Sequence, residues 1–241
     1  MMIQIILIIL LVVWMLYWFI TMSYFIRKGH HLAKITHRYT RFLFNGKPNI
    51  VFVGDSTAVG TGASNPEKSV PGLLAKEYPQ ASITNIAING AKISDMIRQL
   101  KKLDQHYDLI MMHISGNDIV KLTPFSVYQT NIKQALTIAK QKAHHVLFVP
   151  TGNVGAITIF PKLIRLLMQY RTKKIREISL KAVQEAGEQV RYVDFFLPTE
   201  KDPFAIEPKR CFAEDRFHPS DLGYSLWMPE INQELSHFFN N

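Results

Sequence analysis

The distribution of apolar residues divides the chain into two parts. From residue 3 to residue 26 almost every position is apolar, and only Gln4, Thr21 and Ser23 interrupt the run. After Pro48, short apolar runs of strand length alternate with longer segments in which apolar residues recur every three or four positions. That second spacing places apolar side chains on one face of a helix. The pattern therefore predicts one long apolar helix followed by a domain of alternating strands and helices.

The apolar runs of the second part predict five strands. The first is rich in Ile, Val and Phe, which suits a strand that is buried on both faces. The strands are expected at residues 49–53, 82–88, 107–114, 145–149 and 190–196. Helices are expected at residues 93–103, 124–142, 159–186 and from Pro219 to about residue 238. Strands that alternate with helices imply a mostly parallel sheet with helices on both faces, so we expect an α/β fold.

Residues 3–26 have the length and composition of a transmembrane helix. About 20 residues in a helix cross the ~30 Å hydrocarbon layer of a bilayer. Aromatic residues gather in the second half of the segment, as at a membrane interface: Trp14, Tyr17, Trp18, Phe19, Tyr24 and Phe25. A cleaved signal peptide is the alternative, but no basic segment precedes the run and no Ala-x-Ala site follows it. We expect residues 1–26 to be a retained N-terminal membrane anchor.

A basic flank follows the anchor at residues 27–48. It contains Arg27, Lys28, Lys34, Arg38, Arg41 and Lys47, and the first acidic residue of the chain is Asp55. Anionic head groups attract such a segment, so residues 27–48 are expected to be a juxtamembrane linker and residues 49–241 the α/β domain. The positive-inside rule favours a cytoplasmic domain, and an extracytoplasmic or periplasmic domain is the alternative.

The net charge of +9 fits a membrane surface better than nucleic acid. No basic stripe interleaved with aromatic residues resembles a nucleic-acid-binding module, so no nucleic-acid partner is expected. A second basic run lies on the helix expected at residues 159–186, and it is either a solvated face or a face resting on anionic lipid. The run contains Lys162, Arg165, Arg171, Lys173, Lys174, Arg176 and Lys181.

Candidate site residues follow three of the predicted strands. Asp55 and Ser56 come directly after the first strand, Gly90 follows the second, and Asn117 follows the third. Ligands of parallel α/β sheets bind beyond the carboxyl ends of the strands. The sequence therefore predicts that Ser56, Gly90 and Asn117 meet at one edge of the sheet.

Asp215 and His218, near the end of the chain, can complete a catalytic triad with Ser56. A serine hydroxyl is a weak nucleophile unless an adjacent base accepts its proton. His218 is the expected base, and it would return the proton to the leaving alcohol. Asp215 lies three residues earlier, so one turn of chain can aim the aspartate and the histidine together.

Four blocks occur in order along the chain: Gly54-Asp55-Ser56, Gly90, Gly116-Asn117-Asp118 and Asp215-x-x-His218-Pro219. In this order and on these elements they resemble the SGNH (GDSL-type) serine hydrolase superfamily, over roughly residues 49–239. The resemblance implies a flavodoxin-like α/β/α sandwich with a five-stranded parallel sheet, and an esterase activity. Thr57 stands where the family commonly has leucine, at a position that varies among its branches.

The resemblance also implies an oxyanion hole. Its donors would be the backbone N–H groups of Ser56 and Gly90 and the side-chain amide of Asn117, all aimed at the charge of the tetrahedral intermediate. The alternatives are ordinary turn roles for Gly90 and Asn117. Asp55 is expected to shape the turn that carries the serine, and Asp118 to hold its own loop without a catalytic role.

Metal and nucleotide chemistry find no support in the sequence. The single cysteine, Cys211, excludes an intramolecular disulfide, and no Cys/His cluster has zinc-ligand spacing. Gly60-Thr61-Gly62 lacks a third glycine at dinucleotide spacing, and no Gly-Lys-Ser/Thr phosphate loop is present. We expect neither a metal nor a cofactor nor a bound nucleotide.

The expected substrate is a carboxylic ester. The anchor and its basic flank favour an acyl lipid or a lysophospholipid-like ester. An O-acetyl esterase acting on a polysaccharide is the alternative enzyme. A catalytically silent, membrane-tethered binding protein is the alternative from another class, and it predicts a damaged triad, whereas all three residues are present.

Overall fold

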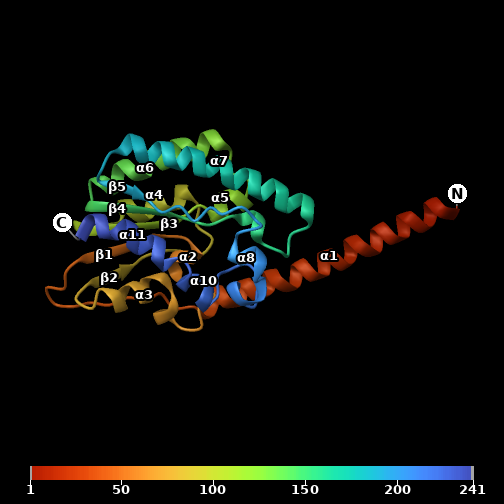
Figure 1. Ribbon diagram of the computed structural model, residues 1–241, viewed down its shortest axis with the longest axis horizontal. Helices are drawn as coiled ribbons and strands as arrows, with labels where there is room; N and C mark the ends of the chain where they lie inside the picture. The colour runs from red at the N-terminus through yellow and green to blue at the C-terminus, as the bar shows by residue number, and fades with distance from the viewer. Residues whose placement is uncertain (1, 240–241) are drawn as a thin grey trace.

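Five parallel strands form the central sheet, in the order β2-β1-β3-β4-β5 (Figure 1). The strands are β1 (Asn49–Gly54), β2 (Ser82–Asn85), β3 (Tyr107–Ile114), β4 (Ala143–Pro150) and β5 (Val190–Tyr192). This is the strand order of flavodoxin-like sheets, so the predicted α/β fold is confirmed. The computed structural model describes residues 2–239. Three residues lie outside the described part of the chain: Met1 of the predicted anchor, and Asn240 and Asn241 of the predicted α/β domain.

Helices cover both faces of the sheet, which makes three layers. Val51 and Val53 of β1 belong to one apolar core and Ile50 and Phe52 to the other, and all four side chains are fully buried. A strand between two helical layers must be apolar on both sides, which explains its uninterrupted run. The first layer contains α4 (Ile93–Lys101), α6 (Phe125–Lys140) and α7 (Lys162–Ala186); the second contains α3 (Val70–Glu77) and α11 (Met228–Phe239).

Several elements are shorter than predicted. Strand β2 ends at Asn85, because that side chain accepts the Ala87 N–H and donates to the Ala58 carbonyl, and β5 ends at Tyr192 rather than residue 196. The last predicted helix is two helices, since Pro229 fits the first turn of α11 but not a helix interior. The short helices are α2 (Ser56–Val59), η1 (Pro66–Lys68), α5 (Gly116–Val120), η2 (Val154–Ala156), α8 (Pro203–Ile206), α9 (Pro208–Cys211) and α10 (Asp221–Ser225).

Helix α1 (Met2–Ile35) projects away from the domain (Figure 1). Its most apolar 18-residue window has a mean hydropathy of 2.7 and contains no buried residue. Among the described residues this is the helix long and apolar enough to cross a membrane, although an N-terminal signal sequence would have the same properties. The helix continues to Ile35, so the first part of the predicted 27–48 linker is helical.

The rest of that linker runs along the outer edge of the sheet. Arg41 forms an isolated antiparallel bridge with Ile83 of the edge strand β2. Its guanidinium donates to the carbonyls of Ala75, Tyr78 and Ala81. The segment therefore covers an edge that would otherwise present unpaired backbone groups. Arg41 binds the segment to the domain.

Candidate active site

The predicted site residues lie at the carboxyl edge of the sheet and on one nearby loop. Ser56 is the first residue of α2, directly after β1, and Asn117 lies in α5, directly after β3. Gly90 lies in the connection from β2 to α4. Asp215 and His218 lie on the loop between α9 and α10. The fold thus gathers residues from both ends of the domain sequence.

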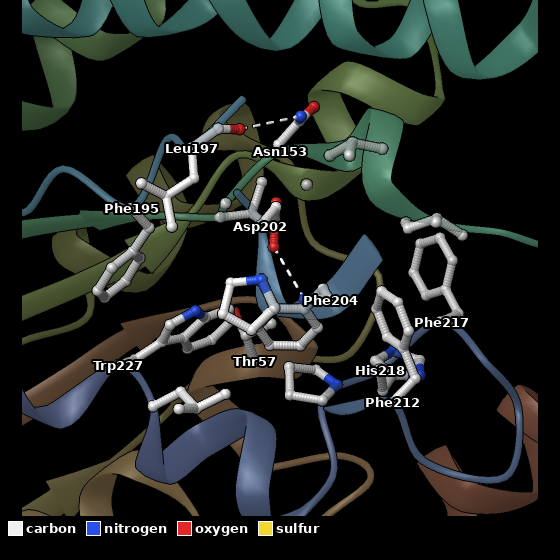
Figure 2. A pocket seen from close by; sticks show the side chains of 18 of the residues that line it. Thr57, Asn153, Phe195, Leu197, Asp202, Phe204, Phe212, Phe217, His218 and Trp227 are labelled. Atoms are coloured by element: carbon white, nitrogen blue, oxygen red, sulfur yellow. Dashed lines mark hydrogen bonds between the residues drawn. The ribbon is translucent and has the colours of Figure 1, made fainter. Parts of the chain in front are cut away.

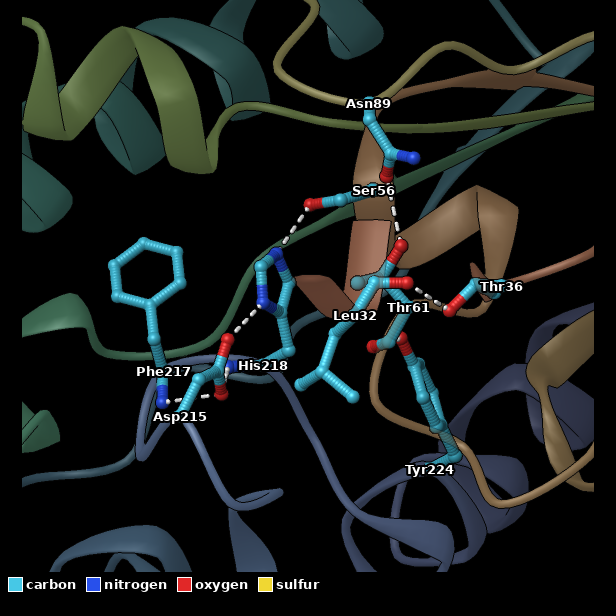
Figure 3. Close-up of polar contacts among 9 residues, drawn as sticks. All are labelled: Leu32, Thr36, Ser56, Thr61, Asn89, Asp215, Phe217, His218 and Tyr224. Carbon is cyan, nitrogen blue, oxygen red and sulfur yellow. Dashed lines mark hydrogen bonds and ion pairs between the residues drawn. The ribbon is translucent and has the colours of Figure 1, made fainter. Parts of the chain in front are cut away.

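Ser56, His218 and Asp215 form a hydrogen-bonded row (Figure 3). His218 Nε2 lies 2.9 Å from Ser56 Oγ, and His218 Nδ1 lies 2.5 Å from Asp215 Oδ2. With the ring proton on Nδ1, the imidazole donates to the aspartate and Nε2 can accept the serine proton. The row has the geometry of a nucleophile, its base and the group that orients the base.

A tight loop holds Asp215 and His218 in this arrangement. Asp215 Oδ1 accepts the backbone N–H groups of Phe217 and His218, each at 3.0 Å. Arg216, which lies between Asp215 and Phe217, adopts a left-handed φ of 54°. At the base of the loop the Ala213 N–H donates to the His218 carbonyl at 2.8 Å. The two side chains are therefore aimed by one stretch of closed backbone.

The Asp215 carboxylate is stabilised in its charged form. Burial alone would raise the pKa of this carboxyl, which is only 1% exposed. The hydrogen bond and charge of His218 and the two backbone N–H groups outweigh burial, so the pKa is lowered from its ordinary value. An ionised Asp215 accepts the hydrogen bond from His218 Nδ1 and so orients the imidazole ring.

Asp55 shapes the turn that presents the serine. Its Oδ1 accepts the Thr57 backbone N–H at 2.9 Å and the Thr57 hydroxyl at 2.6 Å, so Asp55 caps the N-terminus of α2. Thr57 therefore supplies a hydrogen bond to Asp55 that a leucine at this position could not make. Burial raises the pKa of Asp55 to about 6, although the two Thr57 hydrogen bonds act in the opposite direction.

The backbone segments that carry two of the proposed oxyanion donors are bound by other side chains. Lys121 Nζ donates to the Gly90 carbonyl at 2.9 Å, and Gly90 has a φ of 76°, which favours glycine. Arg171 of α7 donates to the carbonyls of Asp118 and Ile119, which lie in the same short helix as Asn117. Arg171 is therefore an inward-facing member of the basic run on α7.

Asp118 also holds this loop, as expected from its position. Its Oδ2 accepts the Ile93 backbone N–H at 2.9 Å, and the side chain is fully buried. Burial raises the pKa of the Asp118 carboxyl. The hydrogen bond joins α5 to the start of α4.

A cavity of about 370 Å³ opens beside Ser56 and His218 (Figure 2). Asn117 lines it, whereas Gly90 is not among the described residues that do so. Most of the wall is aromatic or aliphatic: Phe195, Leu197, Phe204, Phe212, Phe217 and Trp227. Apolar walls around a few polar groups are typical of small-molecule sites.

The polar lining residues that the sequence did not single out include Asn153 and Asp202. Asn153 follows β4 at the same sheet edge, so the reasoning that selected Asn117 applied to it as well. Its amide donates to the Leu197 carbonyl at 3.2 Å, and its oxygen accepts the Gly155 N–H at 3.0 Å. Asp202 caps α8 by accepting the Phe204 N–H, and burial raises the Asp202 pKa to about 6. Both residues brace cavity wall segments.

The end of α1 contacts the site, which nothing in the sequence pattern predicted. Asn89, next to Gly90, donates to the Ala33 carbonyl at 3.1 Å. It also accepts the Thr61 hydroxyl at 2.7 Å (Figure 3). Lys28 pairs at 3.0 Å with Glu214, the residue directly before Asp215. The last turns of α1 therefore contact both the Gly90 turn and the loop of Asp215.

Among residues 2–239, no three His, Cys, Asp or Glu side chains are grouped closely enough to hold a metal ion. The lone thiol, Cys211, is buried, and burial raises its pKa. The arrangement of Ser56, His218 and Asp215 is that of acyl-transfer chemistry by a serine, which uses only protein groups.

A flavodoxin-like sheet with a serine, a histidine and an aspartate in a row at its carboxyl edge defines an α/β serine hydrolase. The profile of the GDSL-like lipase/acylhydrolase family matches residues 52–226, and the chain belongs to this family. The description of this family names lipases and acylhydrolases. The SGNH resemblance is thereby confirmed.

Known proteins similar to this chain agree with the family. A GDSL-like esterase of Mycobacterium tuberculosis is 25% identical over an alignment of 187 residues that covers 74% of this chain and 58% of that protein. The chain thus spans little more than half the length of this curated relative.

Solved structures of low identity share the fold. A lipolytic protein of the G-D-S-L family from Veillonella parvula is 19% identical with a TM-score of 0.59, over 77% of this chain and 96% of that one. A psychrotrophic esterase from Pseudoalteromonas is 14% identical with a TM-score of 0.58, over 81% of this chain and 100% of that one. An extracellular lipase from Streptomyces rimosus is 17% identical with a TM-score of 0.56, over 77% and 99%.

Proposed function

We propose that this protein is a membrane-anchored serine esterase whose substrate is an ester with an apolar acyl chain, such as an acyl lipid or a lysophospholipid. The cavity carries this proposal. Ser56 and His218 face a space of about 370 Å³ whose walls are mainly aromatic and aliphatic. An acyl chain gains free energy when such walls remove it from water, at roughly 25 cal/mol per Å² of buried apolar surface.

In the proposed reaction Ser56 Oγ attacks the ester carbonyl carbon while His218 Nε2 accepts the hydroxyl proton. Collapse of the tetrahedral intermediate breaks the bond to the alcohol, which leaves with the proton from His218. Water then attacks the acyl-serine with His218 again as base. This second half releases the carboxylic acid and restores Ser56. Asp215 keeps the imidazole in place and stabilises its positive charge.

The oxyanion of each tetrahedral intermediate would accept hydrogen bonds from the Ser56 N–H, the Gly90 N–H and the Asn117 amide. Two contacts support this assignment. Lys121 binds the carbonyl that follows the Gly90 N–H in the same turn, and Arg171 holds the short helix that carries Asn117. Donors that are fixed before the reaction need no reorganisation when charge develops.

We further propose that α1 is retained, spans the membrane with residues 3–26, and leaves the domain on the cytoplasmic side. The contacts of α1 with the domain support retention, because cleavage after residue 26 would separate Phe25 from the Arg216 guanidinium 4.9 Å above its ring. The basic residues that follow the apolar run support the orientation.

Protease protection tests the anchor and its orientation separately. A C-terminal tag on the full chain in intact spheroplasts should survive external protease, and carbonate should leave the chain in the membrane. Digestion of the tag would overturn the orientation alone. Release of a shortened soluble product would overturn the anchor.

A series of p-nitrophenyl esters of increasing acyl length tests the substrate class, with Ser56→Ala as the control. We expect the wild type to prefer medium or long acyl chains, because only these fill the apolar cavity. A preference for acetate would instead favour an O-acetyl esterase acting on a polysaccharide. If the protein hydrolyses none of the esters and a serine-reactive fluorophosphonate does not label it, a catalytically silent binding protein would be favoured.

A further inference from the structure

The start of α7 leaves a row of large apolar side chains uncovered by protein. Leu163, Leu166, Leu167 and Tyr170 are 78%, 54%, 42% and 53% exposed. Their spacing of three, four and seven residues puts them on one face of the helix. Met168 on the opposite face is 4% exposed and belongs to the core. A contiguous exposed apolar face of this kind marks a contact with lipid or with another protein.

A chain of side-chain contacts links the segment before this face to the proposed anchor. Phe160, two residues before α7, packs edge-on against Phe217, in the loop that carries Asp215 and His218, with ring centroids 6.4 Å apart. The neighbouring Arg216 lies over the ring of Phe25 in α1. Figure 1 shows that the first turns of α7 and the whole apolar part of α1 project toward the same side of the domain. A bilayer that α1 crosses would therefore adjoin the start of α7.

The charge around this face suits an anionic lipid surface. The chain has no Asp or Glu from residue 119 to residue 176. Lys162 and Lys173, at either end of the apolar row, are exposed. Apolar side chains flanked by lysine and arginine are the composition of helices that lie in a membrane interface.

We propose that this face of α7 inserts into the same leaflet that α1 enters, so that the cavity draws its ester from the lipid phase. The segment before α7 links the two, because Ile157 and Phe217 line the cavity while Phe160 packs on Phe217. The occupant of the face is an anionic phospholipid bilayer. This inference rests on the proposed anchoring of α1 and adds a second contact with the membrane.

Fluorescence quenching by lipid-borne nitroxides tests the insertion. The full chain, with Cys211→Ser, carries one environment-sensitive dye at Leu166→Cys and is reconstituted in vesicles of phosphatidylcholine and phosphatidylglycerol. The matched control is Phe44→Cys, because Phe44 is 87% exposed. Phe44 also lies at the amino end of β2, where the N–H of the preceding Leu43 donates to Ser82. Leu10→Cys in α1 reports the anchor. We expect at least about threefold more quenching at position 166 than at position 44.

Equal quenching at positions 166 and 44, with strong quenching at position 10, would overturn the insertion while the anchor stands. No quenching at position 10 would show that the proposed anchoring fails, and this inference would fail with it.

Activity gives a second readout. The measured quantity is the ratio of the activity on a vesicle-embedded ester to the activity on a water-soluble ester. This ratio should fall about tenfold in the variant Leu163→Gln/Leu166→Gln/Leu167→Gln. Phe42→Gln/Phe44→Gln is the control for surface apolarity and should keep the wild-type ratio. An unchanged ratio in the α7 variant would overturn the proposal.

Discussion

Gly29 of α1 lies directly against the carboxylate of Asp215. A Cβ atom built on Gly29 would lie 3.1 Å from Asp215 Oδ2, the oxygen that accepts the hydrogen bond from His218. That distance is shorter than ordinary van der Waals contact, so glycine leaves room for the carboxylate that a larger side chain would crowd. The helix proposed to anchor the protein thus contacts the residue proposed to orient its catalytic base.

Gly29→Val should therefore impair catalysis without unfolding the domain. The added side chain would displace the Asp215 carboxylate, and a misplacement of ~1 Å at an active site can cost up to ~100-fold in rate. We expect kcat to fall at least about tenfold with a smaller change in KM, measured on a water-soluble ester in detergent. His31→Ala, on the exposed side of the same helix, is the control. Wild-type kcat in Gly29→Val would mean that the contact does not position Asp215.

Ser56→Ala should remove nearly all esterase activity and leave the fold intact. Loss of the nucleophile leaves only substrate binding and oxyanion effects, so we expect a loss of at least ~10³ in kcat. A fluorophosphonate probe followed by peptide mass analysis should label Ser56 in the wild type and nothing in the variant. Ser126→Ala, an exposed serine on α6, should be labelled like the wild type. An active Ser56→Ala protein would disprove the nucleophile.

Asn117→Ala should lower kcat by ~10²–10³ with a smaller change in KM, as removal of one oxyanion donor does. Asn117→Asp should be at least as harmful, because it places a negative charge beside the developing one. Steady-state kinetics on one soluble ester measures both variants. If kcat stays at the wild-type value in both, Asn117 is a turn former.

Asp55→Asn should change how stability depends on pH. The asparagine oxygen can still accept both Thr57 hydrogen bonds, while the buried charge is removed. The folded-state pKa of about 6 lies above the ordinary 3.8, so the folded protein binds this proton more tightly than the unfolded chain does. The protonated Asp55 therefore contributes to the free energy of unfolding at acid pH, and this contribution is lost as pH rises through about 6.

Relative to Asp55→Asn, the unfolding free energy of the wild type should fall by up to about 3 kcal/mol between roughly pH 4 and pH 8. Urea unfolding of both full chains in the same detergent measures this difference, in which the titrating groups that are not coupled to Asp55 cancel. Parallel curves for the two proteins would contradict the raised pKa.

The sequence by itself determined the sheet and the order of the site residues. The apolar run of β1 is a local property, and burial between two helical layers demands it, so it could be identified without any contact being known. Asp215 and His218 were also predicted as a pair, because a spacing of three residues confines both to one turn. The ends of β2 and β5 were placed too far along, since side-chain hydrogen bonds such as those of Asn85 decided them.

Only the tertiary structure decided what surrounds these residues. The contact of Lys28 with Glu214 joins positions 186 residues apart, and the contact of Gly29 with Asp215 depends on how a whole helix docks. The walls of the cavity come from Phe195, Phe204 and Trp227, whose sequence context is that of ordinary core residues. Hydrophobic periodicity reports which side of an element is apolar, but not which other element covers it. That is why the sequence could specify a serine hydrolase site, while its bracing by α1 and the uncovered face of α7 emerged only from the packing.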